Sequence, residues 1–105
     1  MKTAAISFIA LSLVAGAATT AAAAERLSDV AYLQAARCKG IAEGLGNVDT
    51  AAVTGLLKKE EVTRVSYIQQ QGESEVRRGK RDAKRENNKA ELTAELKGAC
   101  AAYLG

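Results

Sequence analysis

The sequence predicts an all-α protein, a small helical hairpin or three-helix bundle that follows a signal peptide. The 105 residues contain no proline, the residue that most strongly interrupts helices. Ala, Leu, Glu, Lys, Arg and Gln are abundant, and all of them favour helix. After the first 24 residues, apolar side chains recur at helical spacing and never alternate strictly, which indicates helix faces rather than strands. A chain of this length predicts one domain.

Residues 1–24 have the three parts of a secretory signal peptide. Lys2 supplies the positive start, and residues 4–18 are uncharged and mostly apolar. The alanine run ending at Ala24 provides the small side chains that signal peptidase requires. We expect cleavage after Ala24 or one or two residues earlier, which leaves residues 25–105 as a periplasmic or secreted domain not integral to the membrane. An uncleaved anchor is the alternative, because the stretch is long enough to span a bilayer.

The first helix of the mature chain is predicted from about Ser28 to Gly44. The Ser28 hydroxyl is a suitable N-cap, and Asp29 suits the positive end of the helix dipole. The Gly-Leu-Gly-Asn sequence from Gly44 onward favours a C-cap. One broad face of this helix carries Val30, Leu33, Arg37, Cys38, Ile41 and Leu45. From this apolar face, Arg37 is expected either to extend into solvent or to pair with Glu61.

The second helix is predicted to begin at Asp49 or Thr50. Neither proline nor a turn sequence interrupts its pattern before Asn87, which leaves two alternatives. One is a continuous helix over residues 50–86, and the other is a break near Gly72, because glycine costs about 1 kcal/mol in a helix interior.

The third helix is predicted from about Lys89 to Tyr103. Asn88 and Glu91 have the spacing of a capping box at its start. Its apolar face carries Leu92, Leu96, Ala99, Cys100 and Tyr103.

A disulfide between Cys38 and Cys100 is predicted to hold the first and third helices together. Residues 25–105 contain only 16 Leu, Ile and Val, which is little core for a domain of this size. The two cysteines are the only ones in the chain, and an exported protein meets an oxidising compartment. A redox-active pair would be closer in sequence, so an intermolecular bridge is the remaining alternative.

A strongly charged stretch covers residues 73–91, where 12 of 19 residues are charged. Its centre has one acid, Asp82, among six basic residues that broadly share one helix face: Arg77, Arg78, Lys80, Arg81, Lys84 and Arg85. One interpretation is a surface that binds an anionic partner, such as phospholipid head groups, lipopolysaccharide, an acidic polysaccharide or an acidic protein. Nucleic acid is not the expected partner in an exported protein.

The other interpretation of this stretch is a solvated helix face, with intrahelical pairs such as Glu73–Arg77, Glu75–Arg78 and Asp82–Arg85. The small residues Gly72, Val76, Gly79 and Ala83 lie opposite the basic ones. They would allow another helix to approach closely, either from this chain or from a second copy in a homo-oligomer.

The composition excludes most catalytic and metal chemistry. The chain has no histidine, and its serines have no neighbouring base in a recognisable motif. The adjacent acids Glu60 and Glu61 diverge on a helix, so a solvated pair in which Glu60 reaches Arg64 is expected. Two distant cysteines without histidine make no zinc site, and no cofactor motif is present. We therefore expect no catalytic residues, no metal and no cofactor.

The sequence supports two hypotheses about function. The first is a non-enzymatic binding or accessory protein whose basic helix face meets an anionic envelope component or an acidic protein. The second is a periplasmic stress or acid-activated chaperone-like protein. An exported, helical chain of under 100 mature residues with one long-range disulfide resembles the small periplasmic acid-stress chaperones in general profile, though not in any motif.

Overall fold

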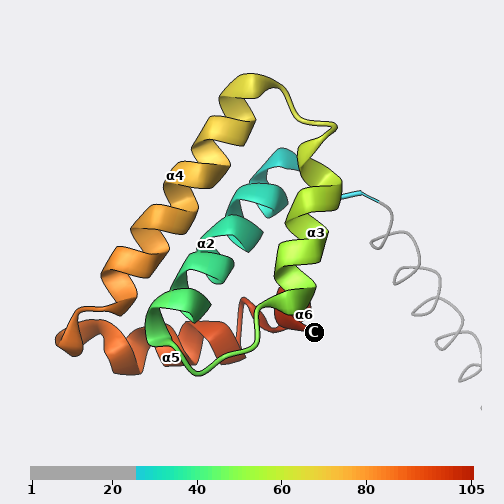
Figure 1. The fold of residues 1–105 in the computed structure, drawn as a ribbon. Helices are drawn as coiled ribbons and strands as arrows, with labels where there is room; N and C mark the ends of the chain where they lie inside the picture. Colours follow the sequence, from blue (N-terminus) through green and yellow to red (C-terminus); the bar gives the residue numbers. More distant parts are fainter. Residues whose placement is uncertain (1–25) are drawn as a thin grey trace, which may run out of the picture.

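The computed structural model, which describes residues 26–105, is all-α and confirms the fold class (Figure 1). Its helices are α2 (Asp29–Leu45), α3 (Ala51–Glu61), α4 (Ser66–Ala83), α5 (Lys89–Lys97) and α6 (Ala101–Leu104), with a 3₁₀ turn, η1 (Glu86–Asn88), before α5. The signal peptide expected over residues 1–24 lies outside the described residues. No helix within residues 26–105 has both the length and the apolar character needed to cross a membrane.

Helices α2, α3 and α4 run side by side, and α5 and α6 cross their lower end (Figure 1). Helix α3 returns the chain beside α2, so that α4 runs parallel to α2 and packs along its length. Helix α5 then passes under the carboxyl ends of α2 and α4, and α6 reaches α3. Helices α2 and α4 therefore form the scaffold on which the other elements lie.

Helix α2 agrees with its prediction to within a residue at each end. The Ser28 hydroxyl accepts a hydrogen bond of 3.1 Å from the Ala31 N–H. At the other end Gly46 has φ of +85°, the left-handed conformation that glycine adopts without steric cost, and its N–H donates to the Ala42 carbonyl.

The prediction for residues 50–86 is wrong in both of its alternatives, because the chain turns between Glu61 and Ser66. The turn contains Val62, Thr63 and Val65, whose β-branched side chains lower helix propensity. The Thr63 hydroxyl donates to the Glu60 carbonyl, which lost its helical partner where α3 ends. The turn is thus stabilised by local hydrogen bonds that do not need glycine or proline.

The predicted helix from Lys89 to Tyr103 is also interrupted. Helix α5 ends at Lys97, and the turn at Gly98–Cys100 separates it from α6. The Asn88 side chain does not cap α5, since its amide donates instead to the Asp82 carbonyl at the end of α4. The turn brings Cys100 against α2.

The Cys38–Cys100 disulfide is confirmed, with an S–S distance of 2.04 Å and Cα atoms 5.6 Å apart. Both cysteines are completely buried. The bridge lies in a core cluster made by α2, α4, α5 and the turn after α5, which consists of Cys38, Ile41, Ala42, Ala83, Leu92, Leu96 and Cys100. The disulfide thus links α2 to the turn after α5 in a core that contains few large side chains.

Helices α2 and α4 approach so closely that their contact excludes side chains larger than hydrogen at several positions. A Cβ atom on Gly40 would lie 2.1 Å from the Val76 carbonyl oxygen, and one on Gly79 would lie 2.6 Å from the Arg37 carbonyl oxygen. A Cβ atom on Gly44 would lie 2.7 Å from the Cβ of Ala83. The helix that occupies the small-residue stripe of α4 is therefore α2 of the same chain.

Candidate anion-binding face

The packing of α4 on α2 determines which of its side chains reach solvent. Gly72, Gly79 and Ala83 are buried against α2. Successive helix residues are 100° apart, so the opposite side of α4 presents Arg77, Arg78 and Arg81. These three are exposed, as are Lys84 and Arg85 in the turn that follows. The structure thus places five of the six predicted basic residues on the outer surface, and the sixth, Lys80, is half-buried at its edge.

The single acid of the basic stretch, Asp82, points toward α2. Its carboxylate lies 3.7 Å from Nη1 of Arg37, whose Nε and Nη2 donate to Glu95 of α5 at 3.1 and 3.2 Å. The predicted Asp82–Arg85 pair and the Arg37–Glu61 pair are therefore wrong. Arg37 instead joins α2 to α4 and α5, which leaves Arg85 without the acid expected to neutralise it.

Two of the six basic residues have acidic partners. Nη1 of Arg78 lies 3.3 Å from Glu75, as its i,i+3 spacing predicts. Nζ of Lys80 lies 3.2 Å from Glu43 of α2, which also pairs with Lys39. Burial raises the pKa of Glu43, but its hydrogen bonds with the two lysines outweigh that effect and lower its pKa overall. Glu43 therefore stays ionised and neutralises Lys80.

Four basic residues keep their charge uncompensated. Within residues 26–105, no carboxylate lies within 4.0 Å of the cationic nitrogens of Arg77, Arg81, Lys84 or Arg85. They surround the carboxyl end of α4, where the helix dipole favours positive charge. We call these four residues the basic face. Arginine forks bind phosphate and carboxylate oxygens in a bidentate manner, which makes this surface suited to an anion.

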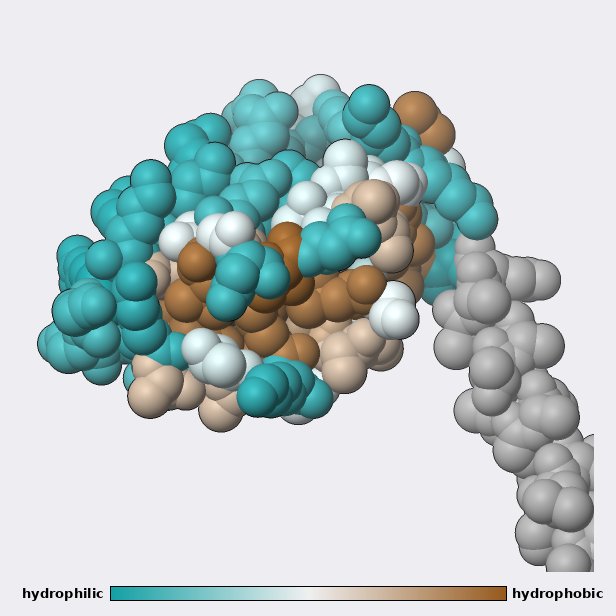
Figure 2. Space-filling model, turned by 60° about the horizontal axis from the view of Figure 1, so that its bottom comes forward, coloured by the Kyte–Doolittle hydropathy of each residue, from teal (hydrophilic) through white to brown (hydrophobic). Residues whose placement is uncertain are grey.

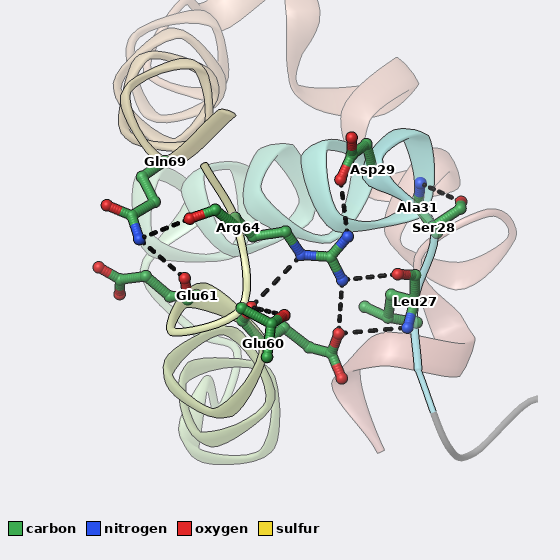
Figure 3. A network of polar contacts seen from close by, with 9 residues as sticks. Leu27, Ser28, Asp29, Ala31, Glu60, Glu61, Arg64 and Gln69 are labelled. Carbon is green, nitrogen blue, oxygen red and sulfur yellow. Dashed lines mark hydrogen bonds and ion pairs between the residues drawn. The ribbon is translucent and has the colours of Figure 1, made fainter. Parts of the chain in front are cut away.

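A buried ion-pair cluster at the opposite end of the molecule was not predicted (Figure 3). Arg64, in the turn between α3 and α4, donates to Asp29 at 2.7 Å, to the Leu27 carbonyl at 2.6 Å and to Glu60. Glu60 in turn accepts from the Leu27 N–H at 3.2 Å. The sequence showed the Glu60–Arg64 spacing, but the structure places both side chains in the interior, where each is about 95% buried.

This cluster joins the segment before α2 to the α3–α4 turn. Burial alone raises the pKa of Glu60, but the hydrogen bond from Leu27 and the contact with Arg64 outweigh it, so the pKa lies below its usual value. Arg64 also lies over the Tyr32 ring, 5.0 Å from its centroid. The cluster therefore positions structural elements and remains charged.

The described residues contain no candidate metal site. No group of three or more His, Cys, Asp or Glu residues within 26–105 is arranged to hold a metal ion.

Models of known protein families, curated proteins and solved structures were compared with the chain, and none of them matches it.

Proposed function

We propose that this is a non-enzymatic binding protein of the periplasm or extracellular space, and that its basic face binds a phosphate-bearing component of the cell envelope. The observation that supports the proposal is the pairing pattern around α4. Asp82 pairs with Arg37 of α2 rather than with a basic residue of its own stretch. Glu43 and Glu75 neutralise Lys80 and Arg78, which leaves the four residues of the basic face without an acidic partner within residues 26–105. The positive charge that remains is concentrated at one end of the molecule.

Other features are consistent with export. A disulfide that joins Cys38 to Cys100 is typical of proteins from oxidising compartments. The first 24 residues have the composition of a secretory signal peptide. Anionic lipid head groups and lipopolysaccharide are abundant surfaces for such a protein, which is why we place them before an acidic protein partner.

The proposal is tested by binding to vesicles that contain phosphatidylglycerol, with neutral phosphatidylcholine vesicles for comparison, over a series of salt concentrations. The protein is used after export, with its disulfide intact. The test variant is R77Q/R81Q, which removes two charges from the basic face. The control is K58Q/K59Q, which removes the same charge from exposed positions on α3.

We expect binding to the anionic vesicles that weakens as salt rises. A basic residue near an anionic membrane contributes about 1 kcal/mol, so R77Q/R81Q should bind about 30-fold more weakly, whereas K58Q/K59Q should change little. Removing the like-charge i,i+4 pair should also stabilise α4 by a few tenths of a kcal/mol, which separates lost binding from lost folding. Equal effects of the two variants would contradict a specific role for the basic face.

A second candidate is an acid-activated chaperone-like function, which the Arg64 cluster favours. Protonation of Glu60 at low pH would leave Arg64 short of a buried partner and would loosen the segment before α2. Two exposed large apolar side chains, Val62 and Val65, lie in the same turn. Suppression of client protein aggregation that appears only at acid pH, and that persists in R77Q/R81Q, would support this candidate over the first.

A further inference from the structure

We propose that a hollow at the lower end of the molecule binds a single-chain anionic amphiphile, such as a fatty acid. The site is distinct from the basic face and goes beyond the proposed function. It has a volume of about 540 Å³, within the usual range of small-molecule sites. The end of α2, the α2–α3 connection, α5 and α6 line it with Leu45, Asn47, Val48, Lys89, Thr93, Leu96, Lys97 and Leu104.

The wall of the hollow is an open side of the hydrophobic core. Leu96 belongs to the core cluster, and Leu45, Val48 and Leu104 pack against that cluster while remaining partly exposed. Figure 2 shows the result as a hydrophobic patch on the underside of the molecule, bordered by hydrophilic side chains. An alkyl chain placed there would continue the core and remove this apolar surface from water.

The charged groups of the lining have one sign. Lys89 and Lys97 both lie on α5, and no carboxylate is among the lining residues. The acid nearest to Lys89 is Glu86, which is 82% exposed and 3.9 Å from Nζ, a distance typical of a weak ion pair. The Thr93 hydroxyl already donates to the Lys89 carbonyl. Lys89 and Lys97 are the first and last residues of α5, so a carboxylate at either end of the hollow would face a lysine, and the Asn47 amide offers a further donor.

A second hollow differs from the first in the charges of its lining residues. It has a volume of about 220 Å³ and lies between α2, α3 and α4 beside Tyr32. Its lining carries Lys39 and Lys58 together with Glu61 and Glu73, so it presents both signs of charge. Of these two hollows within residues 26–105, the larger one pairs an apolar wall with cations only, which is the pattern that complements an amphiphilic anion.

The experiment is calorimetric titration of the exported, oxidised protein with laurate below its micellar concentration. Octanoate tests the contribution of chain length, and dodecyltrimethylammonium tests the sign of the head group on an equal alkyl chain. The test variants are K89Q/K97Q and Thr93→Phe, the second of which places a large apolar group in the hollow from an exposed position on α5. K58Q/K59Q is again the charge control. Amide NMR shifts then locate the bound laurate.

We expect one laurate per chain, with shifts at Val48, Leu96 and Leu104. K89Q/K97Q should weaken laurate binding about tenfold, while the control retains it. Octanoate should bind much more weakly, since each methylene contributes up to about fourfold. Thr93→Phe should abolish binding without reducing the cooperativity of unfolding.

Three results would overturn the proposal. One is the absence of saturable laurate binding. Another is equal binding of laurate and dodecyltrimethylammonium, which would leave no role for the lysines. The third is a dimer in the absence of any amphiphile whose interface covers Val48 and Leu104, because the hollow would then be closed by a second copy.

Discussion

At the scale of single residues, the buried charges of Glu60 and Arg64 depend on one another. The Glu60 carboxylate is held by Arg64 and by the Leu27 N–H, and these contacts keep its pKa below the usual value despite the opposing effect of burial. Since the folded state binds the proton less readily than the unfolded state, this contribution to stability is complete above about pH 4.5. It is lost as the pH falls through the lowered pKa of the folded state.

Glu60→Gln should therefore reduce stability near neutral pH by about 3 kcal/mol, because Arg64 loses a charged partner in the interior. The variant should also show a weaker loss of stability between pH 4.5 and lower values than the unsubstituted protein. Urea unfolding at several pH values measures both effects. Glu61→Gln, at an exposed neighbouring position, should stay within about 0.5 kcal/mol of the unsubstituted protein. An unchanged pH slope in Glu60→Gln would contradict the assigned role.

Spacing along the chain predicted some ion pairs correctly, but the predicted Glu73–Arg77 and Asp82–Arg85 pairs do not form. The Glu60–Arg64 and Glu75–Arg78 contacts follow from spacings of four and three residues, and both occur. Neither alternative for Arg37, extension into solvent or a pair with Glu61, included its actual partner Glu95, which is 58 residues away. That contact depends on how α5 crosses α2, and no local pattern encodes the crossing.

At the scale of elements, glycine has opposite effects on stability in α2 and α3. The contact between α2 and α4 has no room for a Cβ on Gly40, which would lie 2.1 Å from a backbone oxygen of Val76. Gly55 of α3 has no other atom within 4 Å of an added Cβ. In the first case the hydrogen atom permits close packing, and in the second it only lowers helix propensity.

Gly40→Ala should destabilise the protein by at least about 1–3 kcal/mol, the usual cost of overpacking, because only a shift of one helix backbone can relieve the clash. Gly55→Ala should stabilise it by about 0.5–1 kcal/mol, the difference in helix propensity. Chemical denaturation of the two variants under the same conditions gives both values. The same sign for both substitutions would mean that α2 and α4 are not packed through their glycines.

Helix positions could be predicted where capping or packing residues signal them, as with Ser28 and Gly46 at the ends of α2. The small-residue stripe also indicated a close helix neighbour, although the sequence did not say which. The turn between α3 and α4 was missed because it is stabilised by Thr63 and Arg64 rather than by glycine or proline. Gly72, where a break was considered, is instead inside α4 and faces Tyr32.

At the scale of the whole molecule, the basic residues could be predicted from sequence, whereas the hollow could not. Amphipathic spacing is enough to place Arg77 and Arg81 on the outside of α4, since it is local information. The hollow is made by Leu45, Leu96 and Leu104, which come from three helices and adjoin only in the folded chain. The surface of one helix can thus be inferred from sequence, whereas a concavity between elements requires their arrangement.

The stability of the whole chain depends on the Cys38–Cys100 bridge, which is separated by 62 residues in sequence. Closing a loop of that length restricts the unfolded state enough to contribute about 4 kcal/mol. Because the total stability of a small domain with little core is only about 5 kcal/mol, Cys38→Ala/Cys100→Ala should lose most of it and be largely unfolded at 25 °C, as measured by circular dichroism. Reductant alone should act slowly on the native protein, because both sulfur atoms are completely buried and become accessible only on unfolding. A double variant with an unchanged urea midpoint would show that packing between α2, α4 and α5 is sufficient without the covalent link.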